Sequence, residues 1–384
     1  NRRVFAAGVS GGIWVNDNVL DPNSSWRAVN DFLASIAVNT LVADPNNPQI
    51  FYAGTGEGWF NGGAVEGIGI FKSTDGGKTW NLLPGATGLT FAYVQKIEMT
   101  PTGTIIAATR AVNSQDGGIF RSTDNGTSFT RVLNTRGADV EVAANGDIYA
   151  SRGIFSTGTI FKSSDDGVTW SDVTPPGGNN PARIEIATAP SNANIVYAIA
   201  QDRNDNTIDW MQKSSDAGAT WVNLPVPQHN DQCVAEATDI TRGQAWFDLI
   251  LAVSPTNPDV VIAGGVDLAR TDDGGQTWTQ ISEWANCSDL QDVHADQHAI
   301  EFRPGFPNEA LFGNDGGIYY STNIGLASKP TFETRDKNYT TSQFYAVATD
   351  NVSGSDYYIG GAQDNGTQQV RSDLGFSSIE IWGG

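Results

Sequence analysis

The feature that most limits how this chain can fold is a short turn sequence that recurs along it. The stretch KSTDGGKTW (72–80) combines a hydroxyl side chain, Asp and Gly with a terminal aromatic residue. Similar stretches place an Asp at the equivalent position, giving the series Asp75, Asp124, Asp165, Asp216 and Asp273. A sixth copy, YSTNIG, has Asn323 there. The copies lie 41 to 57 residues apart, a spacing that indicates a repeat architecture built from one supersecondary unit.

Each repeat has the pattern of four short β-strands. In the unit 37–83, VNTLVADPNNP ends an apolar run at a Pro/Asn turn, QIFYAGTGE is a second run, and GIGIFKSTDGGKTW holds a third strand, the turn and the start of a fourth. Four-stranded antiparallel units of this length are typical of β-propellers. We therefore predict an all-β propeller of seven or eight four-stranded antiparallel blades, with units at 4–30, 37–83, 94–133, 139–174, 182–224, 246–281, 298–333 and 344–384.

Composition narrows the class of protein further. A closed repeat array shares one core, so we predict a single domain over 1–384, either whole or cut from a longer multidomain protein. No apolar run reaches about 18 residues, which predicts no membrane insertion. The net charge is −21, from 22 basic and 43 acidic residues. Because phosphates would be repelled, nucleic acid is not an expected partner; the charge serves either solubility or an acidic surface for cations or basic partners.

The repeated turn itself is predicted to be structural. Its Asp can accept hydrogen bonds from N–H groups of the turn, and Gly77 suits the positive φ of the chain reversal. The aromatic residue that follows, Trp80 in the first copy, offers a large apolar surface to the gap between blades. This end of each blade is therefore expected to stabilise the fold.

The only two cysteines occupy equivalent places in successive repeats. Cys233 follows Trp221, and Cys287 follows Trp278. Neighbouring repeats would bring these loops side by side, which favours a disulfide in an oxidising compartment. Two free thiols are the alternative.

The turn copies resemble those of the Asp-box, or BNR-repeat, β-propellers. That family includes sialidases, xyloglucan-hydrolysing glycosidases, the sortilin receptor domain and a photosystem assembly factor. The segments YAGTGEGWFNGG and GNDGGIYYS are also similar to secreted Asp-box proteins of the Bacteroidota. These resemblances imply a propeller that is secreted or on the cell surface, with further C-terminal domains in some members. They do not by themselves imply one activity.

The resemblance also implies that functional residues lie at the blade end opposite the repeated turns. That end is built by the loop entering each first strand and the loop between second and third strands. Catalytic candidates there are Asp248, Asp296, Asp315 and Asp364. Clustered carboxylates would raise one another's pKa values. Candidates for ligand binding are Glu57, Trp59, His294, His298 and Asp267.

The run His294-Ala295-Asp296-Gln297-His298 also raises a metal site as an alternative. In an extended stretch His294, Asp296 and His298 point to one side, and imidazole and carboxylate groups are metal ligands. No cofactor is required by the sequence, and calcium is the cation we consider. The competing interpretation is a polar, water-filled channel with hydrogen-bonded histidines. His229, on the loop 225–245, is predicted to be a surface residue.

The sequence lacks some of the catalytic residues that known glycosidases of this resemblance use. The unit 37–83 resembles the first-propeller segment of xyloglucan-hydrolysing enzymes, in which a catalytic Asp lies six residues before the Pro of the DP turn; Asn39 stands there in this chain, and Asn is no general acid. The arginine set and tyrosine nucleophile of sialidases are not evident. We therefore expect a binding module for carbohydrate or a protein partner. The alternative is a glycoside hydrolase that uses another carboxylate pair, Asp248 with Asp296 or Asp315 with Asp364.

Overall fold

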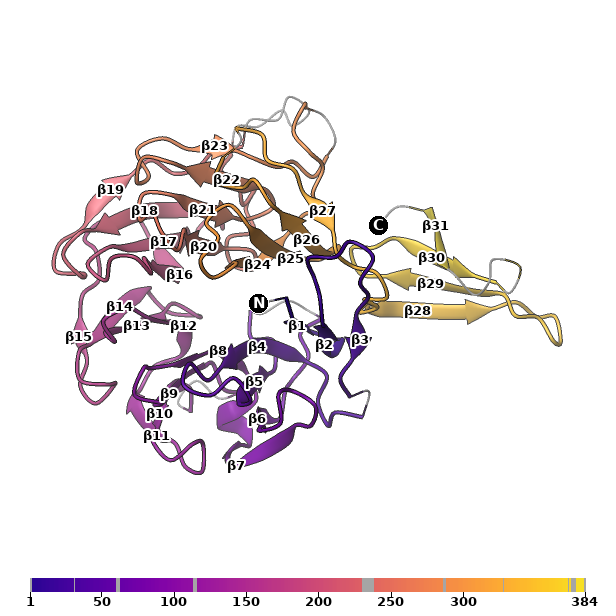
Figure 1. Cartoon of the computed structure of the whole chain (residues 1–384), viewed down its shortest axis with the longest axis horizontal. Coiled ribbons are helices and arrows are strands. Elements are labelled where there is room, and N and C mark those ends of the chain that lie inside the picture. Colours follow the sequence, from indigo (N-terminus) through magenta and orange to yellow (C-terminus); the bar gives the residue numbers. More distant parts are fainter. Residues whose placement is uncertain are drawn as a thin grey trace.

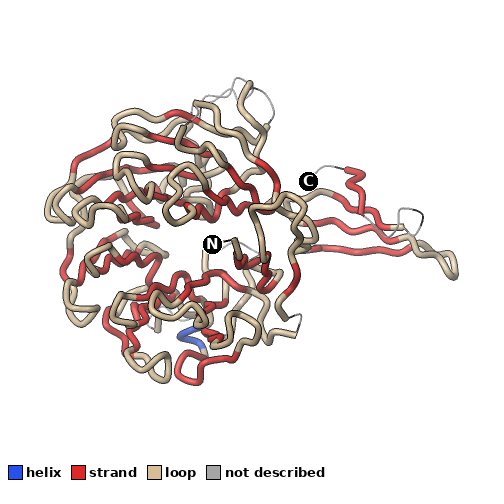
Figure 2. The backbone as a smooth tube through the Cα atoms, viewed as in Figure 1, coloured by secondary structure: helices blue, strands red, loops and turns tan. Residues whose placement is uncertain are grey.

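Short antiparallel strands make up nearly all the regular structure of the protein (Figure 2). The computed structural model describes residues 2–382 except 31, 60–62, 113–115, 230–237, 286–287, 327, 372 and 374–377. Its strands form eight sheets, seven of four strands and one of three. Within the described residues the one helical element is a 3-10 turn, η1 (Leu89–Phe91). None of these residues belongs to a helix with the length and apolar character needed to cross a membrane.

The sheets follow the chain in order, each strand pairing with the next. The first four sheets contain β1 (Val4–Gly8), β2 (Gly12–Asn16) and β3 (Arg27–Ala28); β4 (Val38–Ala43), β5 (Phe51–Thr55), β6 (Gly69–Ser73) and β7 (Asn81–Thr87); β8 (Val94–Met99), β9 (Ile105–Thr109), β10 (Gly118–Ser122) and β11 (Thr130–Leu133); and β12 (Gly137–Val142), β13 (Ile148–Arg152), β14 (Thr159–Ser163) and β15 (Ser171–Asp172).

The other four sheets have the same order. They contain β16 (Pro181–Thr188), β17 (Val196–Asp202), β18 (Ile208–Ser214) and β19 (Val222–Leu224); β20 (Ile250–Val253), β21 (Val261–Gly264), β22 (Leu268–Thr271) and β23 (Thr279–Gln280); β24 (Gln297–Phe302), β25 (Ala310–Asn314), β26 (Gly317–Ser321) and β27 (Glu333–Thr334); and β28 (Phe344–Thr349), β29 (Tyr358–Ala362), β30 (Thr367–Val370) and β31 (Ser378–Trp382).

The sheets from β1–β3 to β24–β27 are arranged as a ring around a central opening (Figure 1). The first strand of each sheet contacts the first strand of the next, from β1 and β4 through to β20 and β24. These first strands therefore face the centre, while the last strands lie at the rim. We call the space that the first strands enclose the channel, and its end at the loops entering those strands the mouth.

The ring closes between the sheet β1–β3 and the sheet β24–β27. The backbone N–H of Trp26 donates to the carbonyl of Lys337 at 2.9 Å, and Nε of Arg335 donates to the carbonyl of Val19 at 3.1 Å. Val19, Trp26 and Ile318 are buried together at this junction. Hydrogen bonds and apolar packing therefore join segments more than 300 residues apart in the sequence.

The two terminal sheets depart from the expected pattern of identical blades. The first has three strands, whereas four were predicted, because the chain after β3 crosses directly to β4 and buries Leu33 beside Ile13 and Trp80. The last sheet, β28–β31, extends outward from the ring (Figure 1). Its first strand exposes Phe344, which would be buried if this sheet were packed like the others.

The repeated turn forms the hydrogen bonds expected from its sequence. In the first copy Oδ1 of Asp75 accepts from the backbone N–H of Thr79 at 2.9 Å and Oδ2 accepts from its hydroxyl at 2.7 Å. The Ser73 hydroxyl accepts from the N–H of Gly77, whose φ is 80°. Trp80 is buried against Phe51 and other residues of the first two sheets. The Asp and Ser side chains of this turn are therefore bonded within the turn itself.

Candidate functional site

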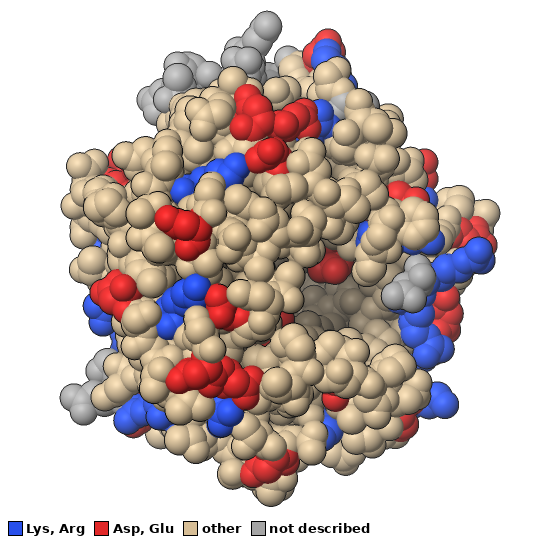
Figure 3. Space-filling model, turned by 60° about the vertical axis from the view of Figure 1, so that its left-hand side comes forward, with Lys and Arg blue, Asp and Glu red and all other residues tan. Residues whose placement is uncertain are grey.

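Four loops at the mouth bring together the aspartates that the sequence singles out. Asp248 lies just before β20 and Asp296 just before β24, whereas Asp315 connects β25 to β26 and Asp364 lies between β29 and β30. The surface is hollowed at the centre of the ring, with an acidic side chain inside the hollow (Figure 3). Both carboxylate pairs proposed from the sequence, Asp248 with Asp296 and Asp315 with Asp364, are in side-chain contact.

Asp248 is the buried member of the first pair. Its side chain is inaccessible to solvent, and neither carboxylate oxygen has a hydrogen-bond donor among the described residues. Burial, together with the charge of Asp296, raises the pKa of Asp248 well above its usual range. A carboxyl without donors is far more stable protonated than ionised in such surroundings. Asp248 is therefore placed to hold a proton and donate it in a hydrogen bond to Asp296.

Asp296 is the partly accessible member of this pair. It adopts a left-handed backbone conformation with φ of 63°, which is uncommon outside glycine and points to a constrained position. Burial and the nearby charges of Asp315 and Asp364 raise its pKa, while His298 and Asp248 oppose that rise. The carboxyl that reaches the mouth therefore retains its proton to higher pH than an ordinary Asp.

Asp315 has the opposite electrostatic balance. Nε2 of His298 lies 2.8 Å from Oδ1 of Asp315. Although burial alone would raise the pKa of Asp315, the His298 hydrogen bond and charge, with the contact to Asp364, lower it. The His298 ring packs edge-on against Phe247, at 4.7 Å between centroids, which orients the imidazole. Two neighbouring carboxyls, Asp296 and Asp315, thus have pKa values displaced in opposite directions.

His294 and Asp364 complete this cluster. Nε2 of His294 lies 3.1 Å from the backbone carbonyl of Asp364, and Nδ1 lies 3.2 Å from that of Ala295. Gly316 allows this approach, because a Cβ at that position would lie 2.3 Å from the His294 ring. Burial and the charge of Asp315 raise the pKa of Asp364. His294 therefore holds the loop between β29 and β30 against the mouth.

The three residues considered as metal ligands do not converge. His294 faces backbone carbonyls, His298 faces Asp315, and Asp296 contacts Asp248. Across the described part of the chain, no group of three or more His, Cys, Asp or Glu side chains is arranged to hold a metal ion. The geometry instead favours hydrogen-bonded histidines, which was the competing interpretation of the sequence.

An apolar cluster, which we call the floor, lies at the mouth and contacts the carboxyl cluster through Phe247 and His298. Trp59, Ile154, Trp246 and Phe247 pack together from the second, fourth and sixth sheets. The guanidinium of Arg183 lies 3.7 Å from the Trp59 ring centroid. Trp59 was expected to contact ligand, but it is only 9% exposed and packs inside the floor.

Arg183 fixes the backbone on both sides of Asp248. Its guanidinium donates to the carbonyls of Trp246 and Phe247, and Nη2 donates to that of Leu249 at 2.9 Å. Glu185 lies 2.5 Å from the same Nη2. Because the planar guanidinium satisfies several acceptors at once, it sets the path of the segment that carries Asp248. Sequence reasoning missed Arg183, which no motif distinguishes.

Other predicted ligand-binding residues are buried. Asp267 forms an ion pair with Arg242, whose Nη2 lies 2.8 Å from Oδ2 of Asp267. Glu57 is also buried, with its backbone N–H donating to the carbonyl of Val65. The side chain of Asn39 donates to the carbonyls of Val94 and Gln95 on the next blade. These residues therefore connect the mouth loops and blades to one another.

The first strands that enclose the channel carry charged groups that sequence reasoning missed. Lys96 lies 3.1 Å from Glu141 and 4.0 Å from Glu98. Burial, with the charge of neighbouring carboxylates, raises the pKa of Glu98 to about 8, although channel water still reaches part of its side chain. A signal was present, because the inner strands repeat an aliphatic-Glu pair at Glu98, Glu141, Glu185 and Glu301.

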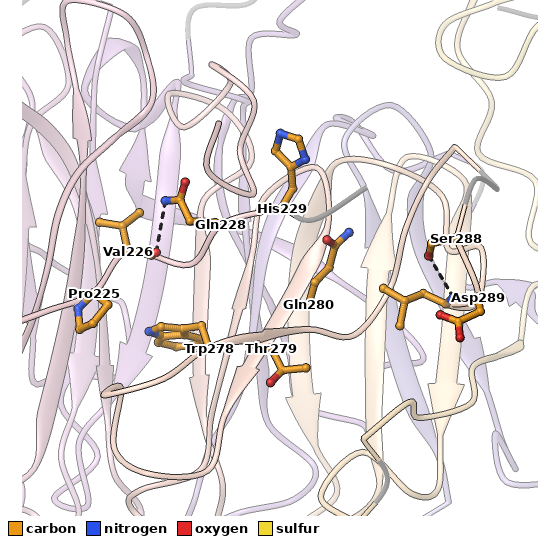
Figure 4. Close-up of a pocket in the computed structure, with 10 residues that line it drawn as sticks. Pro225, Val226, Gln228, His229, Trp278, Thr279, Gln280, Ser288 and Asp289 are labelled. Carbon is orange, nitrogen blue, oxygen red and sulfur yellow. Dashed lines mark hydrogen bonds between the residues drawn. The ribbon is translucent and has the colours of Figure 1, made fainter. Parts of the chain in front are cut away.

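A cavity of about 610 Å³ lies away from the mouth, between the loops that follow β19 and β23. Pro225, Val226 and Trp278 line one part of it, and Ser288 lies across from them (Figure 4). His229 also lines this cavity. Its ring accepts a hydrogen bond from the N–H of Thr238, and it is buried, so the prediction of a surface residue is wrong. The predicted Cys233–Cys287 disulfide lies outside the described residues.

No protein-family profile matches this chain. A xyloglucanase of Hypocrea jecorina is 26% identical over 258 residues, which covers 64% of this chain and 25% of that enzyme. A xyloglucanase of a Paenibacillus species is 27% identical over 242 residues, covering 56% of this chain and 21% of the enzyme. The chain thus spans about a quarter of these relatives.

Solved structures show the fold resemblance more completely. An ancestral GH74 enzyme superposes with a TM-score of 0.66 at 16% identity, over 96% of this chain and 51% of that one. YCF48 bound to D1 peptide superposes with a TM-score of 0.53 at 15% identity, over 83% of this chain and 89% of that one. The chain is therefore a β-propeller protein that is similar in sequence to xyloglucanases and in fold to a GH74 enzyme.

Proposed function

We propose that this protein is a secreted glycoside hydrolase that cleaves a β-glucan such as xyloglucan at the mouth of the ring. One observation carries the proposal. Asp296 and Asp315 are neighbouring carboxyls whose surroundings raise the pKa of one and lower that of the other. Such a divergence separates a general acid from an ionised carboxylate, the two groups that most glycoside hydrolases need.

The roles follow from protonation and access. Asp296 reaches the mouth and donates its proton to the glycosidic oxygen as the bond to the sugar carbon breaks. Asp315, held ionised by His298, then acts in one of two ways: it takes a proton from the water that bonds to the sugar carbon, or it bonds to that carbon itself and is later released by water. Asp248 does not touch the substrate, because it is buried beneath Asp296. It acts as a positioning residue, because its own proton stays in the hydrogen bond to Asp296 and orients that carboxyl, whose separate proton is the one transferred.

The similarity to xyloglucanases supports this choice of substrate. The matched segments cover more than half of this chain but about a quarter of each relative. Asp296 and Asp315 differ from the position that the family resemblance would assign to a catalytic Asp, which is Asn39 here. The proposal therefore takes the substrate class from the relatives and the catalytic groups from the geometry of this mouth.

Release of reducing ends from xyloglucan tests the proposal. The unmodified chain should release them, Asp315→Asn should lose at least about 100-fold of the rate, and Asp289→Asn, an exposed change near the rim, should not. Circular dichroism and thermal unfolding confirm that each variant folds. Absence of turnover on xyloglucan and on unbranched β-glucans would overturn the hydrolase proposal.

A carbohydrate-binding module is the second candidate, and a specific observation favours it. The Asn39 amide is engaged by two carbonyls of the neighbouring blade, so this residue stabilises the interface between blades. A propeller with Asn at that position can bind a glucan without cleaving it. Retention of the protein in polyacrylamide gels containing xyloglucan, with no release of reducing ends, would favour binding over hydrolysis.

A further inference from the structure

An exposed aromatic side chain at the mouth, Phe155, has two guanidinium groups close to its ring. It is in the loop between β13 and β14, with 56% of its surface exposed. Cζ of Arg136 lies 4.9 Å from the ring centroid, and Cζ of Arg110 lies 5.5 Å from it. Phe155 also has a left-handed φ of 57°. A bulky residue held in this conformation is strained, which the surrounding structure must enforce.

The neighbouring loop reinforces this arrangement. Arg110 lies over the ring of Tyr93, at 4.3 Å from the centroid, and its backbone N–H donates to the Tyr93 carbonyl. The N–H of Val112 donates to the carbonyl of Leu89, and both of these apolar side chains are exposed. These backbone bonds hold two mouth loops together, and the loops present exposed apolar side chains in the same region as the Arg110 guanidinium.

The floor connects this patch to the candidate catalytic residues. Ile154, which precedes Phe155, packs with Trp59, Trp246 and Phe247. Phe247 contacts the His298 ring, and His298 bonds to Asp315. A continuous row of packed side chains thus runs at the same end of the ring, from the fourth sheet to the seventh. A linear polymer lying on the mouth could contact both regions.

We propose that Phe155, Arg110 and Arg136 form a sugar-binding subsite that holds a polysaccharide chain remote from the point of cleavage. The aromatic ring would stack on the apolar C–H surface of one sugar ring, while the guanidinium forks donate to its hydroxyl oxygens. The choice of a neutral β-glucan as the ligand rests on the proposed function. The existence of the subsite rests on the arrangement of these three side chains.

Affinity electrophoresis in gels containing xyloglucan tests the subsite. Phe155→Ala should weaken retention about tenfold, the loss expected when one well-placed aromatic contact is removed. Phe155→Trp should restore it. The matched control is Phe306→Ala, because Phe306 is also exposed and has Arg303 at 3.7 Å from its ring, but lies between β24 and β25 at the opposite end of the ring. This control should change retention less than about twofold.

The outcomes separate the subsite from the proposed function. Loss of retention in Phe155→Ala but not in Phe306→Ala supports the subsite, whether or not reducing ends are released. Equal retention of Phe155→Ala and the unmodified protein overturns it and leaves hydrolysis standing. Hydrolysis by an unmodified protein that the gel does not retain also overturns it. Retention that requires a uronic-acid polymer in place of xyloglucan would overturn the neutral ligand.

Discussion

Aspartates at the two ends of the blades have opposite protonation behaviour. At the repeated turn, hydrogen bonds from Thr79 and Ser73 lower the pKa of Asp75 to about 2. At the mouth, burial and neighbouring carboxyls raise the pKa of Asp248 and Asp296. The turn supplies donors to exposed carboxylates, whereas Asp248 at the mouth lacks both water and donors; Asp315, which keeps the His298 donor, is the exception at that end. The same residue type therefore stabilises a turn at one end and stores a proton at the other.

The largest expected effect of this contrast is on catalysis. Asp296→Asn removes the proposed proton donor and should lower xyloglucan hydrolysis by about 100- to 10,000-fold. Asp75→Ala lies at the other end of the ring and should leave the rate per folded molecule unchanged. Both rates are measured from reducing ends and normalised to folded protein. Equal losses in the two variants would mean that the mouth has no special role.

The next largest effect is expected on stability, when Arg183, which holds the backbone at the mouth, is replaced. Arg183→Met breaks a buried ion pair with Glu185 and removes the donors to the Phe247 and Leu249 carbonyls. Removing one partner of a buried pair costs about 3–5 kcal/mol of the free energy of unfolding. Urea denaturation measures this cost.

Arg303→Met provides the comparison at the end of the blades that carries the repeated turns. Its partner, Glu309, lies 2.7 Å away, and both side chains are more accessible than those of Arg183 and Glu185. Since water screens accessible pairs, this variant should lose much less stability than Arg183→Met. A similar loss in both would show that Arg183 acts as an ordinary surface pair and does not organise the floor.

The pH dependence of stability should show the two kinds of carboxyl separately. The folded-state pKa of Glu98 is raised to about 8 by burial and neighbouring charges. The folded state therefore binds this proton more tightly than the unfolded state, and the resulting stability is complete below about pH 4.5 and lost as the pH rises through about 8. The turn aspartates behave oppositely, because their stability is present above the ordinary Asp pKa and lost as the pH falls through about 2.

Denaturation between pH 2 and 9 measures both contributions. Glu98→Gln should reduce the loss of stability between pH 5 and 8, and Asp75→Ala should reduce the loss below pH 4. If Glu98→Gln left the loss of stability between pH 5 and 8 unchanged, the channel glutamates would titrate as ordinary, hydrated groups.

The sequence was most informative where the pattern repeats. The unit 94–133 corresponds to β8–β11, because period-two apolar runs and Pro/Asn turns are local signals. The pairing of Asp248 with Asp296 was also foreseen, since both enter first strands and must meet at the mouth. The burial of Trp59 and His229 was not, because loop paths depend on distant partners such as Arg183, which lies 124 positions after Trp59. Local patterns predict strands well and the direction of loop side chains poorly.

The smallest effect is expected from a single repeated turn. Asp75→Ala removes the acceptor for the Thr79 N–H and hydroxyl and for the Lys78 N–H. The turn is exposed, so water replaces much of this bonding, and the loss of stability should be measurable but well below that of Arg183→Met. Asp165→Ala changes the equivalent turn between β14 and β15 and should cost a similar amount. Thermal unfolding compares the two variants. A large loss at one turn and none at the other would contradict an equivalent role, whereas equal small losses would support it.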